Sequence, residues 1–359
     1  MKAIFLQRQQ QLLRQLTERQ LDGLLILGHE NIQYITGFTG NAAYAIITAQ
    51  HQFLITDYRY FERAQHECQG FEVVSRDRDN ESLGACIDRH LFDVNTLGFD
   101  AAFINVSAWQ AILSELGKRN VQAVTGLIER QRMVKDDWEI KQTKLAAAIA
   151  DQALAETMGY FKAGVTEREV ALELEYRLQK LGSQGMAFST IMLFAERTSL
   201  PHGNPGEQLL HEGDFITLDF GAVINGYRSD MTRSYILGAA STEQKAIYDT
   251  VSAAQQAAVS VLKPGVNGHD VYLASQAVLQ ASAYGQWAGE GLGHGVGLFL
   301  HEQPILGPKT DYCLEPGNII TIEPGIYIPG LGGVRLEDDY LITQTGCQVL
   351  THAPKPFEI

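Results

Sequence analysis

Cysteine is scarce in this sequence, and the few cysteines are not grouped. The 359 residues include four, Cys68, Cys86, Cys313 and Cys347, and no two of them form a C-x-x-C pair. Scattered thiols of this kind fit neither a disulfide framework nor a zinc–thiolate site. We therefore expect reduced thiols in a cytosolic protein.

Long apolar runs and a surplus of positive charge are also missing. No window reaches the roughly 18 consecutive apolar residues of a membrane span, and the first residues lack an apolar core of signal-peptide length. The sequence therefore predicts a cytoplasmic location without membrane contact. The net charge of −14 argues against nucleic acid as a partner, because phosphate binding needs a basic surface.

The first third of the chain has no glycine-rich phosphate loop. The segment 37–40 holds too few glycines at the wrong spacing for a dinucleotide fingerprint. Four polar residues lie near expected strand ends, and each alone is more typical of a surface or an interface than of a catalytic site: His29, Asp57, Tyr58 and Arg59. This third therefore identifies no function.

The length of the chain suggests about two domains. Short apolar or alternating runs at 24–27, 44–48, 53–56, 71–74, 96–99 and 121–124 alternate with segments at helical spacing, which predicts an α/β domain. Asp136 or Asp137 can then cap a helix that continues through an Ala-rich run to Ala155. We place the domain boundary near residue 130, with an N-terminal domain over 1–130 and a second domain over 131–359.

A short pattern occurs twice in the second domain. Residues 161–170 and 262–271 each contain Lys-x-Gly-Val, a polar cap, an acidic residue and Val, and each follows an Ala-rich helical segment. A match this short can arise by chance, so a duplication stays one of two interpretations. If it is real, the domain has two related α/β halves with a site in the cleft between them.

Five residues in the second domain form the strongest functional signal. Asp219 ends a predicted strand, and Asp230 follows an Asn-Gly turn, so antiparallel pairing would bring the two carboxylates together. His294 lies between glycines, Glu323 in Thr-Ile-Glu-Pro-Gly, and Glu337 in Val-Arg-Leu-Glu-Asp. Each carboxylate alone is more typical of a cap or a salt bridge, but two buried aspartates repel unless a cation compensates. The set suits two ions of Mn²⁺, Co²⁺, Fe²⁺ or Zn²⁺, which lower the pKa of a bridging water and polarise a carbonyl.

Three more residues extend this candidate site. His202, in Leu-Pro-His-Gly, and His301, in Leu-His-Glu, flank the proposed metal ligands in the sequence and could donate hydrogen bonds to a substrate carbonyl or a tetrahedral intermediate. Arg335 lies two residues before Glu337, so on one strand both would point the same way, and the guanidinium would orient a ligand carboxylate.

At these motifs the sequence resembles the metal-dependent Xaa-Pro peptidases, which include aminopeptidase P, prolidase and their relatives with the pita-bread fold. The segments that carry the resemblance are 218–221, 229–233, 293–297, 301–302, 322–327 and 333–338. It covers nearly the whole chain, and the first third resembles the creatinase-type N-terminal domain. It implies an α/β N-terminal domain followed by an α+β pita-bread catalytic domain with an internal pseudo-twofold duplication.

The resemblance also implies roles for the candidate residues. Asp219, Asp230, His294, Glu323 and Glu337 would hold two divalent ions, with Mn²⁺ as the first choice. Asp230 and Glu337 would bridge the ions, and Glu323 would also shuttle a proton. The implied protein is a homodimer that hydrolyses Xaa-Pro bonds in dipeptides or at peptide N-termini, with the metal-bridging water as the nucleophile.

By the same resemblance, His202 and His301 would position the substrate and stabilise the intermediate. The sequence departs from the family pattern at 191–198 and at Phe299, where relatives often carry Glu. Both places could line the pocket, and they bear on proline preference more than on hydrolysis.

Other functions fit the same scaffold. One is a non-catalytic binding module, another an aminopeptidase with a specificity broader than Xaa-Pro, and a third a creatinase-like hydrolase that uses histidines without metal. The intact set of five ligand candidates argues against the first and the third. Dipeptidase and aminopeptidase P activity are not separated by the sequence.

Overall fold

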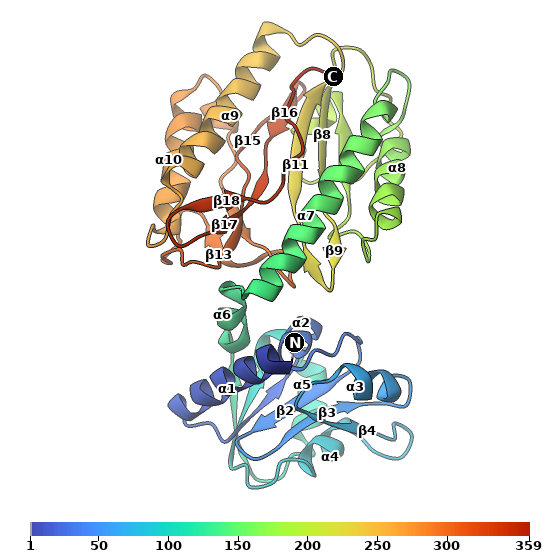
Figure 1. Cartoon of the computed structure of the whole chain (residues 1–359), viewed down its shortest axis with the longest axis vertical. Helices are drawn as coiled ribbons and strands as arrows, with labels where there is room; N and C mark the ends of the chain where they lie inside the picture. The colour runs from blue at the N-terminus through green and yellow to red at the C-terminus, as the bar shows by residue number, and fades with distance from the viewer. Residues whose placement is uncertain (1) are drawn as a thin grey trace. The chain divides into compact units, whose positions relative to one another are not determined.

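The computed structural model describes residues 2–359, which divide between Arg132 and Met133 into two compact units (Figure 1). Among the described helices, none combines the length and the apolar character needed to cross a bilayer. The four cysteines carry free thiols.

The first unit is built on a mixed six-stranded sheet of order β4-β3-β2-β1-β5-β6. Its strands are β1 (Gly23–Ile26), β2 (Tyr44–Thr48), β3 (Gln52–Thr56), β4 (Glu72–Ser75), β5 (Thr96–Asp100) and β6 (Asn120–Val124). Strand β2 runs antiparallel to both neighbours, and the other adjacent pairs are parallel. The strands β1, β3, β4, β5 and β6 therefore end at the same edge of the sheet.

Helices lie before, between and after these strands. They are α1 (Lys2–Glu18), α2 (His29–Thr36), α3 (Phe61–Glu67), α4 (Leu83–Asp88), η1 (Ala101–Phe103), α5 (Val106–Leu113) and α6 (Leu127–Met133). Ser82 and Asn105 cap α4 and α5 through side chains that accept hydrogen bonds from backbone amides. All six strands expected from the alternating runs are present, so the predicted α/β class of this unit is confirmed.

The second unit consists of two halves, each with a pair of helices covering antiparallel strands. In the first half, α7 (Asp137–Thr157) and α8 (Glu167–Lys180) pack on β7 (Ile191–Phe194), β8 (Phe215–Phe220) and β11 (Met231–Ile236), in the order β11-β8-β7. Asp136 caps α7 in a capping box with Glu139, as the sequence suggests. The two helices of this half are green in Figure 1.

The second half repeats this plan. Helices α9 (Thr242–Val261) and α10 (Gly268–Ala281) cover a five-stranded sheet of order β13-β12-β14-β17-β18. Its strands are β12 (Gly293–Gly295), β13 (Glu302–Leu306), β14 (Ile319–Ile322), β17 (Asp338–Ile342) and β18 (Cys347–Val349). The remaining elements are η2 (Met158–Tyr160), η3 (Ala195–Ser199), η4 (Gly285–Trp287) and the hairpins β9 (Val223–Ile224) with β10 (Tyr227–Arg228) and β15 (Gly325–Ile328) with β16 (Gly332–Arg335).

The repeated sequence pattern marks equivalent turns in the two halves. Gly164 and Gly265 both have a positive φ, of 90° and 83°, which favours glycine. The amide of each donates to a leucine carbonyl at 2.8 Å, that of Leu210 in one half and that of Leu314 in the other. Helices α8 and α10 each begin three residues after the glycine. The expected internal duplication is therefore confirmed, and chance is the wrong interpretation.

Candidate active site

A cavity of about 390 Å³ in the second unit gathers the eight site residues predicted for this domain. Its walls include the five ligand candidates, both histidines and the arginine: Asp219, Asp230, His294, Glu323, Glu337, His202, His301 and Arg335. Eight further residues complete the lining: Phe188, Ser189, Ile191, Pro201, Gly203, Asn204, Leu300 and Tyr327. Phe299 is not among them, so the expectation that it lines the pocket is wrong. Ile191, from the other departing segment, does line the pocket.

Strand pairing explains how the carboxylates meet. In the antiparallel ladder of β8 and β11, Asp219 lies opposite Thr232, and Asp230 immediately precedes β11. His294 lies in the middle of β12, which pairs with β14, and Glu323 follows the last residue of β14. The expected antiparallel approach of the two aspartate segments is therefore present.

The expectation that Arg335 and Glu337 alternate on one strand is wrong. Arg335 ends β16, where it pairs with Gly325 of β15, while Glu337 lies in the short link before β17. Strand β17 belongs to another sheet, so the chain changes sheets between the two residues. Glu337 is held instead by Thr232, whose carbonyl accepts from the Glu337 amide at 3.2 Å and whose hydroxyl donates to Glu337 Oε2 at 2.6 Å.

Three of the candidates already have the spacing of metal ligands. Asp230, His294 and Glu337 each offer an atom, and these atoms lie within 4.8 Å of one another. Oε1 of Glu323 lies 3.3 Å from His294 Nε2. Asp219 is outside this group of three, and its Oδ2 accepts from Arg335 Nη2 at 2.7 Å.

Electrostatics make this arrangement unfavourable without a counter-charge. Burial, followed by the negative charge of neighbouring carboxylates, raises the pKa of Asp230 and of Glu337 well above the usual range. Burial also raises the pKa of Glu323 to about 7. Oδ1 of Asp219 is buried without a hydrogen-bond partner among the described residues. An oxygen-rich set with an unpartnered oxygen and mutual repulsion fits divalent cations.

The imidazole of His294 is also oriented and protonated as a metal ligand would be. A carbonyl can only accept, so Nδ1 must be the donor in the 3.0 Å contact with the Gly295 oxygen. Burial lowers the pKa of His294, which favours the neutral ring. The lone pair of Nε2 then faces the carboxylates, as in a metal-ligating histidine oriented by a backbone carbonyl.

Comparisons with known proteins agree with this geometry. Residues 141–344 match Metallopeptidase family M24, and residues 8–134 match the Creatinase/Prolidase N-terminal domain. The chain belongs to metallopeptidase family M24. An uncharacterised peptidase of Bacillus subtilis is 37% identical over 336 residues, which are 93% of this chain and 95% of that protein.

Two solved structures have the same fold as this M24 chain. A structure described as an Xaa-Pro dipeptidase from Bacillus anthracis has a TM-score of 0.95 and 35% identity, covering 99% of this chain and 100% of that one. A structure described as an X-Pro aminopeptidase from Thermotoga maritima has a TM-score of 0.90 and 33% identity, covering 98% and 99%. The predicted creatinase-type domain followed by a pita-bread domain is confirmed.

His202 and His301, which line the M24 cavity, are both exposed to solvent. The ring of His301 lies edge-on to that of His294, at a centroid distance of 4.3 Å. Burial, followed by the charge that His294 would carry, lowers the pKa of His301, so a neutral ring is favoured. His202 is exposed at the rim.

Some site residues were not found from the sequence. Arg335 Nη1 donates to the Tyr327 hydroxyl at 3.0 Å, so Tyr327 supports the guanidinium that contacts Asp219. Thr321 accepts from the His294 amide at 3.1 Å and donates to Glu323 Oε1 at 3.2 Å. Thr321 lies two residues before Glu323, so strand alternation could have indicated it, whereas nothing in the sequence points to the contact of Tyr327.

The chain just before α7 also contacts the neighbourhood of the cavity. Lys135 Nζ lies 2.7 Å from Glu302 Oε1, and these side chains are only 1% and 8% exposed. The Lys135 amide donates to the Gly317 carbonyl at 2.9 Å. Asn318 Nδ2 donates to the Met133 carbonyl at 2.9 Å. The segment that opens the M24 unit is therefore bonded to the residues beside His301 and at the start of β14.

Proposed function

We propose that this M24 protein hydrolyses Xaa-Pro bonds, in dipeptides or at peptide N-termini. The observation that carries the proposal is the gathering of four carboxylates and a neutral imidazole in one cavity of about 390 Å³. The names of the two solved relatives, an Xaa-Pro dipeptidase and an X-Pro aminopeptidase at 35% and 33% identity, support the choice of bond.

Asp219, Asp230, His294, Glu323 and Glu337 would hold two divalent ions, with Mn²⁺ as the first choice. Such a pair would activate a water as the nucleophile and polarise the scissile carbonyl. The residue set fits this role because its negative charges are buried and its oxygens are incompletely paired.

The protein's own groups perform the proton and orientation steps. Glu323, which lines the cavity beside His294, would accept a proton from the attacking water and deliver it to the leaving proline nitrogen. His301, neutral and directed at the same cavity, donates a hydrogen bond to the developing oxyanion, and His202 contacts the substrate at the rim. Arg335 fixes the orientation of Asp219 through their 2.7 Å contact.

The decisive experiment measures hydrolysis of Ala-Pro and Ala-Pro-Ala by the purified Mn²⁺-supplemented protein, with Ala-Ala as the comparison. We expect turnover of at least one proline substrate, with kcat/KM at least about 10-fold above that of Ala-Ala. Absence of turnover of both proline substrates by folded protein refutes the proposal. Equal rates on Ala-Ala favour the broader aminopeptidase, and the ratio of the two proline substrates separates dipeptidase from aminopeptidase P.

Matched variants show that the activity belongs to this cavity. Glu323→Gln removes the proton acceptor and should lower kcat by about 100-fold or more. Glu243→Gln makes the same chemical change on the exposed first turn of α9 and should leave kcat unchanged. The predicted homodimer stays a prediction, which light scattering on the eluting protein tests.

A further inference from the structure

The first unit contains a cavity of about 460 Å³ that the proposed peptidase chemistry does not use. Its walls follow the ends of four strands: Gly28 after β1, Asp57 after β3, Arg76 after β4 and Phe103 after β5. The chain runs from β1 outward to β4 and then crosses to β5 on the other side of β1. In open α/β sheets, ligands bind outside the carboxyl ends of the strands where the strand order reverses in this way.

The charged side chains that line the cavity carry an excess of positive charge, although the whole chain has a net charge of −14. Arg59, Arg76 and Arg78 line the cavity with a single carboxylate, that of Asp57. Hydrogen bonds from Arg59, at 2.8 and 2.9 Å from its guanidinium, hold the pKa of Asp57 at about 2. Arg78 approaches the same carboxylate at 3.4 Å. The one negative charge is therefore compensated, and a positive excess remains.

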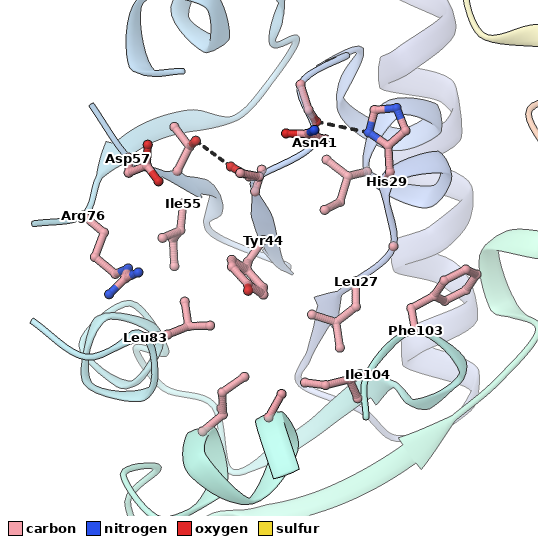
Figure 2. A pocket seen from close by; sticks show the side chains of 18 of the residues that line it. Leu27, His29, Asn41, Tyr44, Ile55, Asp57, Arg76, Leu83, Phe103 and Ile104 are labelled. Atoms are coloured by element: carbon pink, nitrogen blue, oxygen red, sulfur yellow. Dashed lines mark hydrogen bonds between the residues drawn. The ribbon is translucent and has the colours of Figure 1, made fainter. Parts of the chain in front are cut away.

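Within the described part of the chain, Arg76 is the arginine of this wall that has no carboxylate partner. Its Nη1 donates to the Glu81 carbonyl at 2.6 Å, and no carboxylate among residues 2–359 forms an ion pair with it. Figure 2 shows Arg76 and Asp57 on one wall and His29 on the opposite wall. Nδ1 of His29 contacts the Gly40 carbonyl at 3.1 Å. The other guanidinium donors of Arg76 remain for an anion.

The rest of the wall is mostly apolar. Leu27, Ile55, Leu83 and Ile104 surround Tyr44 at the centre of the view (Figure 2). The Tyr44 hydroxyl has no hydrogen-bond partner within the described part of the chain. A concave apolar site with a few convergent polar groups is the usual form of a small-molecule pocket, and its volume lies in the usual range.

We propose that this cavity binds a small organic acid, with the carboxylate at Arg76 and an apolar body against the leucine and isoleucine walls. The guanidinium of Arg76 presents paired N–H groups that match a carboxylate, and the Tyr44 hydroxyl adds one donor. Inorganic phosphate would make no use of the apolar walls. This site is separate from the metallopeptidase cavity, and its test does not depend on the proposed Xaa-Pro activity.

Isothermal titration of the full-length protein with 3-phenylpropionate, 3-phenylpropionamide and inorganic phosphate tests the proposal. We expect a dissociation constant on the order of 1 mM or below for the carboxylate, which suits a ligand of this size. The amide and phosphate should bind at least about 10-fold more weakly. Chelation removes metal ions from the peptidase cavity, so any carboxylate binding there is lost, whereas binding in the first-unit cavity persists. Titrations before and after chelation therefore distinguish the two sites.

Three variants locate the binding. Arg76→Gln should weaken carboxylate binding by about 10-fold or more. Ala108→Phe fills the cavity from the exposed side of α5, so it should also prevent binding without disturbing the core. Arg19→Gln removes an exposed arginine outside the cavity and should bind as the parent does.

Four results would overturn the proposal. They are no carboxylate binding below about 10 mM, an amide or phosphate affinity equal to that of the carboxylate, unchanged binding by folded Arg76→Gln, and unchanged binding by Ala108→Phe. If Arg76→Gln fails to fold, as circular dichroism would show, Ala108→Phe and the amide comparison still decide. Peptidase activity of the folded variants should equal that of the parent.

Discussion

Asp100→Asn should remove a pH dependence from the stability of the first unit. Asp100 ends β5, is 4% exposed, and accepts from Asn31 Nδ2 at 2.7 Å. The same Asn31 nitrogen donates to Glu129 Oε1 at 2.8 Å, so two carboxylates share one donor group. Burial, followed by the negative charge of Glu129, raises the pKa of Asp100 from 3.8 to about 7.

The sign follows from proton binding. Between pH 3.8 and about 7 the folded state retains a proton that the unfolded state has released, so the free energy of unfolding falls as the pH rises through this window. A shift of about three pK units corresponds to about 4 kcal/mol at full effect. The stabilising contribution of the protonated group is complete below pH 3.8 and is lost above about pH 7. The uncharged asparagine cannot titrate, so the variant should be the more stable protein at pH 8 and about equal at pH 4.

Urea unfolding at pH 4, 6 and 8 measures this difference. Trp109 stacks on Phe99 at 3.6 Å between ring centroids and is the tryptophan of the first unit. A background with Trp138→Phe and Trp287→Phe makes its fluorescence report on that unit alone. If the stabilities of the parent and of the Asp100→Asn variant change in parallel from pH 4 to pH 8, the raised pKa of this carboxyl is refuted.

Three further predictions concern the M24 unit. His301→Gln should lower kcat on the best proline substrate by about 100-fold with little change in KM, because its proposed bond forms in the transition state; a change confined to KM in steady-state kinetics would contradict this. Chelation should abolish turnover and lower the free energy of unfolding by about 2.7 kcal/mol relative to protein at 100 times the metal Kd, with recovery on adding Mn²⁺; an unchanged Tm would argue against metal binding. Arg233→Met should lower the free energy of unfolding, measured in urea, by about 3–5 kcal/mol, because Arg233 lies 2.8 Å from Asp338 and the two side chains are 1% and 2% exposed. A decrease below about 1 kcal/mol would show that Lys355, which is also bonded to Asp338, alone compensates the charge of Asp338.

Local patterns were enough to predict much of the fold. Alternation located β8, and the Asn-Gly pair located the tight turn between β9 and β10, where Asn225 and Gly226 both have positive φ. The pairing of β8 with β11 then placed Asp219 near Asp230. Each of these features depends on residues close together in sequence, which is why the sequence sufficed.

Features that depend on a change of sheet were not predictable. Gly333 to Tyr340 has the pattern of one alternating strand, but the hairpin β15–β16 ends at Arg335 and β17 joins a different sheet. The contact of Tyr327 with Arg335 requires that hairpin to be folded. The cavity of the first unit is assembled from the ends of four separated strands, so His29 and Asp57, considered singly, gave no indication of it.

The bonds made by residues 133–135 have a consequence for shortened forms of the protein. The family match begins at residue 141, so the matched range leaves out residues 133–135 and the bonds that they make. A chain cut there would remove Lys135 from the carboxylate of Glu302, the Met133 carbonyl from the Asn318 side-chain amide and the Lys135 amide from the Gly317 carbonyl. The smallest piece able to keep His301 where it is therefore starts at Met133, eight residues earlier than sequence similarity alone would suggest.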